Sequence, residues 1–483
     1  MPSVNKQSLR EEFTALKERF GQLSSDGKVG AESRALIEAL LMLMQVLIAV
    51  FMEKNTSKTS TNSSKPSSRT EKDESALSRI GTHTKGKAYD PSRSANTRTV
   101  ETVALSKVSS CEECGEDLRE VRPRGHERRT QIDIVFEKVL SHVDAEIKSC
   151  PHCGTDTRAP FPESFSGPLQ YGSGIKAYAL NLLIAQMIAL KRVQQSIHTL
   201  IGQLISEATI LKYVLQLHLA LARWERLAID RILTEPAMHV DETSIRVDKH
   251  NHWIHVCSAG DITLKFVHER RGLEAMAAIG IIPKYGGVIV HDCWASYLSY
   301  AHCGHGLCGA HLLRELTFIV ESNSYAWAKN MKRLLQQTCA RVSRRKRKRL
   351  TAREYEALQQ HYRNILTRGE RELPPIPAKQ TGKRGRLAKS DAHNLWERLK
   401  EHETAVLLFA NDSNVPFTNN RAERDLRMSK VKQKISGCFR NAEFAQAYCR
   451  ISSYLQTMAN RSVNPLVAIQ MALSGQLYAE SGE

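Results

Sequence analysis

Three acidic residues, Asp241, Asp292 and Glu423, have the types and positions expected of carboxylates that carry phosphoryl-transfer chemistry. Such chemistry uses carboxylates from separate elements that converge on two divalent ions about 3.5–4 Å apart. Asp241 lies inside an otherwise apolar stretch, where a charge is costly unless it is paired or bound to a metal. Asp292 ends a second apolar stretch rich in β-branched residues, and Glu423 lies at the start of a segment with a helical pattern.

Each carboxylate also has a simpler explanation when it is taken alone. Asp292 could cap a turn, and Glu423 has the spacing from Asn420 that a helix capping box requires. Glu242 and Asp425 are neighbours of two of these residues and are expected to stay outside the set, Glu242 because successive strand side chains face opposite ways. The ordered triad inside a basic chain favours the catalytic interpretation.

The elements that must position the triad are predicted to form a ribonuclease-H-like α/β core at 233–311 and 416–475. Alternating apolar residues predict three strands at 236–245, 252–259 and 262–268, then a helix at 273–279 and a buried strand at 287–292. Strands in this order match such a sheet, and the ends of parallel strands meet at one edge, where sites form. A basic, mostly helical insertion at 312–415 separates the two parts of the core, and 476–483 is a tail.

Two CxxC pairs predict a structural zinc site in a domain at 101–165. Each pair is followed by a glycine, which lets backbone amides turn toward the thiolates, and two such knuckles supply the four ligands of tetrahedral zinc. The loop between the pairs is longer than usual, and His152 is an alternative ligand. The four predicted ligands are Cys111, Cys114, Cys150 and Cys153.

A second group of histidines and cysteines follows Asp292 and has two interpretations. Its crowded spacing matches no standard metal site, so a fifth strand entering a helix is favoured over a second zinc site. The group is His302, Cys303, His305, Cys308 and His311.

The net charge of +18 indicates a polyanionic partner, with nucleic acid favoured over membrane. A run at 341–349 holds seven Lys or Arg residues, and 381–386 is a basic loop punctuated by glycines. Dense runs of this kind favour phosphate contact over a merely solvated face. The residues predicted to contact DNA are Arg345, Arg347, Lys383, Arg384, Arg424, Arg427, Lys430 and Lys434.

Two segments before the core are predicted to be helical. Leucines spaced 4-3-4-3 in 1–54 predict two helices broken at 24–27, which could form either an internal hairpin or a dimerising coiled coil. The polar stretch 55–100 is a predicted disordered linker. Residues 166–232 resemble a helix-turn-helix with Gly202 near the turn and Ser206 capping the second helix, although plain helical bundles share that pattern.

The chain is expected to be cytoplasmic. Its first 30 residues are polar and charged, and the apolar run 39–52 is shorter than the roughly 20 residues of a membrane-spanning helix. Eleven cysteines, four of them in CxxC pairs, suit a reducing compartment.

Several long motifs resemble the transposases of the insertion sequence 66 family. They are HVDET at 239–243, VHDCWASY at 290–297, CGAHLLREL at 308–316, NNRAERDLR at 419–427 and KISGCFR at 434–440. The order of the helical arm, the CxxC region and the final helices also agrees. Cys293 stands where we would more often expect glycine.

The resemblance implies a DDE transposase in which Asp241, Asp292 and Glu423 hold two magnesium ions. It implies cleavage and strand transfer at the terminal inverted repeats of an insertion element, in a nucleoid-associated homo-oligomer that works with small accessory proteins. Two other functions compete with this one. A zinc hydrolase could use Asp241 and Asp292 with His239, His291 and His311, and a regulator could bind DNA without cutting it.

Overall fold

The structure, a computed structural model, describes residues 6–59, 61–63, 103–129, 131, 134, 137–163, 165–375 and 389–476. Most of the predicted linker at 55–100, the tail from residue 477, and both Lys383 and Arg384 lie outside these residues. The chain divides into two compact units. One comprises 73–179 and 190–210, and the other comprises 1–72, 180–189 and 211–483.

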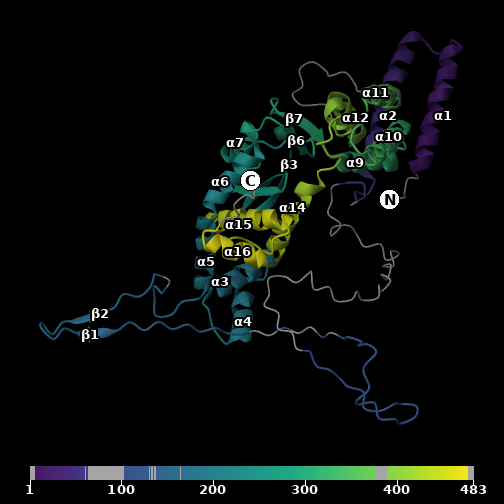
Figure 1. Cartoon of the computed structure of the whole chain (residues 1–483). Helices are drawn as coiled ribbons and strands as arrows, with labels where there is room; N and C mark the ends of the chain where they lie inside the picture. Colours follow the sequence, from purple (N-terminus) through teal and green to yellow (C-terminus); the bar gives the residue numbers. More distant parts are fainter. Residues whose placement is uncertain are drawn as a thin grey trace. The chain divides into compact units, whose positions relative to one another are not determined.

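A mixed five-stranded sheet in the order β5-β4-β3-β6-β7 lies at the centre of the larger unit (Figure 1). Its strands are β3 (Ala237–Val247), β4 (His250–Ala259), β5 (Ile262–His268), β6 (Val288–His291) and β7 (Gly304–Leu307). The first three pair antiparallel as a meander, whereas β6 and β7 run parallel to β3. The predicted strands are therefore present in the predicted order, and β7 leads into α9 as the favoured fifth strand.

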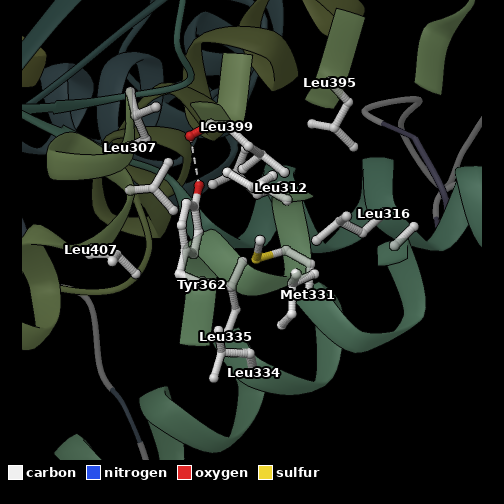
Figure 2. Packing of buried hydrophobic residues seen from close by; sticks show 14 of the residues in the cluster. Leu307, Leu312, Leu316, Met331, Leu334, Leu335, Tyr362, Leu395, Leu399 and Leu407 are labelled. Atoms are coloured by element: carbon white, nitrogen blue, oxygen red, sulfur yellow. Dashed lines mark hydrogen bonds between the residues drawn. The ribbon is translucent and has the colours of Figure 1, made fainter. Parts of the chain in front are cut away.

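Helix α7 (Leu273–Ile279) and the 3-10 turn η4 (Ile282–Lys284) connect β5 to β6. The short helix α8 (Ala295–Leu298) connects β6 to β7. Five helices then form the insertion: α9 (Gly309–Asn323), α10 (Ala326–Ser343), α11 (Ala352–Glu372), α12 (Asp391–Glu401) and α13 (Glu403–Asn411). They share an apolar core, in which the Tyr362 hydroxyl donates to the Leu399 carbonyl over 2.8 Å (Figure 2).

The chain returns to the sheet through α14 (Asn420–Ser436), α15 (Ala442–Asn460) and α16 (Pro465–Leu473), shown in yellow in Figure 1. Helix α14 packs on β3 and β4, and α15 packs on β5. Strand β5 lies at the edge of the sheet, where its backbone groups have no neighbouring strand to pair with. Hydroxyl groups of α15 accept hydrogen bonds from these backbone amides. The amide of Thr263 donates to Thr457 over 3.1 Å, and that of Lys265 donates to Ser453 over 2.8 Å.

The N-terminal arm consists of α1 (Lys6–Ser25) and α2 (Ala31–Lys54), joined at Gly27, whose φ of +68° suits glycine. Helix α2 packs on α9, and its buried Glu53 accepts the amide of Asp391 at the start of α12 over 2.7 Å. Most of its leucine seam is exposed. By length and composition alone, α2 is the one helix among the described residues that could cross a membrane; the apolar run within it looked too short for this.

Helices α5 (Glu207–Ala220) and α6 (Ala222–Ile232) lead into β3, and α6 packs on β5. Before them come α3 (Ser173–Leu180), a π-helix η3 (Asn181–Ala185) and α4 (Leu190–Ile201). The smaller unit also contains a two-stranded hairpin, β1 (Ile147–Ser149) with β2 (Asp156–Arg158).

Candidate active site

Asp241 and Asp292 lie at the same edge of the sheet. Strands β3 and β6 pair in parallel with His239 opposite Val290. Continuing that register by two residues brings Asp241 level with Asp292, directly after the end of β6. The parallel pairing that the sequence predicted therefore places the two aspartates side by side.

The environment of Asp241 disfavours its charge. Burial, the largest cause, and the negative charges of Glu242, Asp292 and Glu423 together raise the pKa of Asp241 to about 7, opposed by a 2.8 Å hydrogen bond from the Glu242 amide. Neighbouring carboxylates repel one another, and burial adds to the cost of their charge. A divalent cation bound between them offsets this cost. Asp292 also accepts the backbone amide of Trp294 over 3.2 Å, so its turn-capping role is present beside its position in the site.

Glu423 reaches the site because Asn419 fixes the start of α14 against β3. The buried Asn419 side chain donates to the Val240 carbonyl over 2.8 Å, and its carbonyl oxygen lies 2.8 Å from Nδ1 of His239. Asn419, and not Asn420, precedes the helix, and its side chain contacts β3 instead of capping α14. The capping-box explanation of Glu423 is therefore wrong.

Glu423 lies beside two residues of the predicted histidine and cysteine group. Its Oε1 is 3.6 Å from Nδ1 of His311, and Cys308 is the third member of the cluster. The other members of the group point elsewhere: Nε2 of His302 is 3.3 Å from the Ile282 carbonyl, and Nδ1 of His305 is 3.1 Å from Nε2 of His291. The five residues do not form one metal site.

Two of the three histidines of the zinc-hydrolase alternative have partners within the fold. His239 is held by Asn419, and His291 contacts His305 and accepts the Cys293 amide over 3.1 Å. Among the described residues, the one cluster of three potential metal ligands is Cys308, His311 and Glu423.

Glu242 is buried next to the site, and its charge is among those that raise the pKa of Asp241. Its side chain is 2% exposed, accepts the Tyr297 hydroxyl over 2.5 Å and pairs with Arg271 over 2.6 Å. Burial raises the pKa of Glu242, and the Asp292 charge adds to the shift. The Arg271 guanidinium lies 4.2 Å from the Trp294 ring centre and 5.0 Å from that of Trp253. A second acid directly after Asp241 was the available sequence signal.

Asp425 lies outside the triad, as expected, but it is buried. It is 1% exposed and accepts the hydroxyls of Ser258 over 2.7 Å and Thr263 over 2.8 Å. Its charge raises the pKa of the buried Lys265, against the larger lowering caused by burial. Asp425 thus attaches α14 to β4 and β5.

The four predicted DNA-contacting residues of α14 differ in exposure. Arg424, Arg427 and Lys434 are exposed, and Arg424 also lies 3.9 Å from Asp425. Lys430 is partly buried and donates to the carbonyl of Ser244 on β3 over 2.9 Å. The exposed three are available to a phosphate backbone, whereas Lys430 has a contact within the fold.

The basic run at 341–349 occupies the last turn of α10 and the following loop, where we had expected mostly helix. Arg345 and Arg341 both pair with Glu354 on α11, and hydrogen bonds from Arg345 and Thr351, with a smaller effect of the Arg341 charge, lower the pKa of Glu354 to about 2. Arg347 is exposed. Two of the seven basic side chains therefore hold the loop in place.

Each CxxC pair forms a tight knuckle in the smaller unit. The Gly115 amide donates to the Cys111 carbonyl over 3.0 Å, and the Gly154 amide donates to that of Cys150 over 2.9 Å. Both glycines have positive φ, +76° and +72°. Hydrogen bonds from backbone amides lower the pKa of Cys111, and contact with Thr155 lowers that of Cys153. Within the described residues, the two knuckles do not bring their four thiols into one cluster.

Helices α4 and the start of α5 have the local features predicted for a helix-turn-helix. Gly202 has φ +66°, and the Ser206 hydroxyl accepts the Thr209 amide over 3.1 Å. Gln194 also donates to the Ile205 carbonyl over 2.7 Å, which ties α4 to the turn.

Comparison with family models now adds to this geometry. The model of the IS66 transposase family matches residues 168–447, which is more than half of the chain and includes all three carboxylates. This chain belongs to the IS66 transposase family. A search of curated proteins finds no match. Family membership indicates that this protein is a transposase that acts on DNA.

Proposed function

We propose that this transposase binds the ends of its insertion element and catalyses DNA cleavage and strand transfer at Asp241, Asp292 and Glu423. The observation that carries the proposal is the parallel pairing of β3 and β6, which sets the two aspartates level at one sheet edge. The hydrogen bond from the Asn419 side chain to the Val240 carbonyl supports Glu423 as the third catalytic carboxylate. A meander followed by two parallel strands supports a ribonuclease-H-like core.

The carboxylates fit magnesium. Burial and neighbouring acids raise the Asp241 pKa to about 7, and Oε1 of Glu423 is buried without a hydrogen-bond partner among the described residues. Carboxylate oxygens are the ligands that Mg²⁺ prefers. Two bound Mg²⁺ ions would activate water or a 3′-hydroxyl and stabilise the leaving oxygen.

The surrounding residues of the chain orient the carboxylates and the DNA. Asn419 fixes the direction of Glu423, and the Trp294 amide fixes Asp292. Arg424 and Arg427 lie on the exposed side of α14 and bind phosphates near the cleaved bond. Further DNA contacts, either independent of sequence or specific for the element ends, come from the zinc knuckles, from α4 and α5, and from the basic loop. The transposase acts as a homo-oligomer with accessory proteins, on nucleoid-associated DNA in the cytoplasm.

The test compares charge-removing variants of the full chain in gel-shift and strand-transfer assays with Mg²⁺. Asp241→Asn, Asp292→Asn and Glu423→Gln should bind element ends as well as the parent, because each removes negative charge from a basic surface. Their strand transfer should fall to background. Glu274→Gln is the matched control, because Glu274 is an exposed acid of α7 in the same core.

Retained strand transfer in any of the three variants would contradict the assignment of that carboxylate. Binding of element ends by the parent without strand transfer would favour the regulator. Glu242 and Asp425 are unsuitable controls because both are buried and bonded.

A further inference from the structure

Cys308, His311 and Glu423 bring a thiol, an imidazole and a carboxylate together next to the two aspartates. One potential ligand atom from each lies within 4.8 Å of the other two. Cys308 directly precedes α9, His311 lies in the first turn of α9, and Glu423 lies in the first turn of α14. The fold thus brings together the starts of two helices that lie far apart in the sequence.

Two of these side chains have unmet polar atoms. Nδ1 of His311 and Oε1 of Glu423 are buried and have no hydrogen-bond partner among the described residues, although they face each other at 3.6 Å. Unsatisfied buried polar atoms are costly and need an explanation. A cation bound by both atoms would remove the cost.

The ligand types determine which cation fits. Sulfur and imidazole ligands favour zinc-like ions, whereas Mg²⁺ prefers oxygen ligands alone. Three protein ligands with an open fourth position are the arrangement of catalytic zinc sites. We propose that Cys308, His311 and Glu423 bind a thiophilic divalent cation of the zinc type, at a site separate from the CxxC knuckles.

The two sites would share Glu423, with a consequence for regulation. A zinc-type ion held by Cys308 and His311 takes Glu423 away from the magnesium site. Zinc would then act as an inhibitor of strand transfer whose effect depends on Cys308. The metal site itself rests on the three side chains and does not require that the proposed strand transfer occur.

The site can be tested with Co²⁺ as a spectroscopic probe. Full-length protein, treated briefly with a chelator to free this site of zinc, is titrated with Co²⁺, and the thiolate-to-cobalt charge-transfer absorption is recorded. The parent should show a band that Cys308→Ser loses, and His311→Gln should weaken cobalt binding. Serine is a favoured residue at the start of a helix, so Cys308→Ser should leave α9 folded, which circular dichroism checks.

Cys293→Ser is the matched control, because Cys293 is a partly exposed cysteine of the same core outside the cluster. It should keep the band. Cobalt that exchanges into the knuckles gives the same signal in the parent and in Cys308→Ser, so the difference between their spectra reports this site alone. Identical spectra for the two proteins would overturn the proposal. If the parent shows the difference but carries out no strand transfer once this site is free of zinc and cobalt and Mg²⁺ is supplied, the strand-transfer proposal fails and this one stands.

Discussion

The side-chain amide of Asn419 donates to the backbone carbonyl of Val240 over 2.8 Å, and this bond joins the two separated parts of the core. Val240 precedes Asp241 on β3, and Asn419 is four residues before Glu423 on α14. The relative position of two of the three carboxylates therefore depends on a residue that carries no charge.

We expect that removing Asp425 destabilises the transposase, although the Asp425 side chain has no role in its chemistry. Asp425→Ala leaves the buried Lys265 without its nearby negative charge and two hydroxyls without an acceptor. We expect the free energy of unfolding to fall by about 3–5 kcal/mol, as for other broken buried pairs. Denaturant unfolding measures this loss, and Glu274→Ala should change the midpoint little. An unchanged midpoint for Asp425→Ala would show that the pair is not stabilising.

Glycine should be better than alanine at position 293. Cys293 has φ +72°, a left-handed conformation that costs a residue with a Cβ about 1–2 kcal/mol. Cys293→Gly and Cys293→Ala remove the same thiol, so the glycine variant should be the more stable by about 1 kcal/mol. At Cys339, inside helix α10, alanine should instead be the better by about 1 kcal/mol. Thermal unfolding of the four variants checks the reversal.

The exposed seam of α2 should mediate self-association. Leu36, Leu40, Leu43 and Leu47 are 73%, 55%, 49% and 59% exposed, at heptad spacing. Leu36→Glu combined with Leu43→Glu should reduce the mass measured by light scattering toward that of a single chain. Ala35→Glu adds charge to an exposed position of the same helix off the seam and should keep the parent mass. An equal mass for all three proteins would mean that the seam does not hold copies together.

The knuckles should hold one zinc ion. Elemental analysis in a Cys308→Ser background, which reads the knuckles alone, should find one zinc per chain. Adding Cys111→Ser with Cys150→Ser should remove it, because one ligand is lost from each pair. Adding Cys339→Ser should leave the zinc in place. Zinc retained by the double knuckle variant would refute the four-cysteine site.

The sequence predicted the strands of the core well because their alternation of apolar residues is local. The helix expected at 273–279 is α7, and the strand expected at 262–268 is β5. Parallel strand order then followed from general rules of sheet topology. The resemblance indicated Glu423, which local reasoning explained equally well as a helix cap.

Contacts between distant segments were beyond prediction from the sequence. The burial of Glu242 depends on Arg271 and Tyr297, which approach it only in the folded sheet. The pairing of Glu423 with His311 likewise depends on how α14 meets α9. Glu53 accepts two backbone amides at the start of α12, a contact that no pattern in the N-terminal segment indicates. A pattern along one segment contains no information about such partners.

The insertion between β7 and α14 also sets an order of events during synthesis. A ribosome completes β3 and β6, with both aspartates, well before it reaches Glu423. The ribosome must synthesise α9 to α13 before α14 can pack on β3, and until then the carboxylate set is incomplete. Under the proposed function, a polypeptide released early would hold DNA through its N-terminal segments yet be unable to cut it, and would compete with intact copies for the same ends.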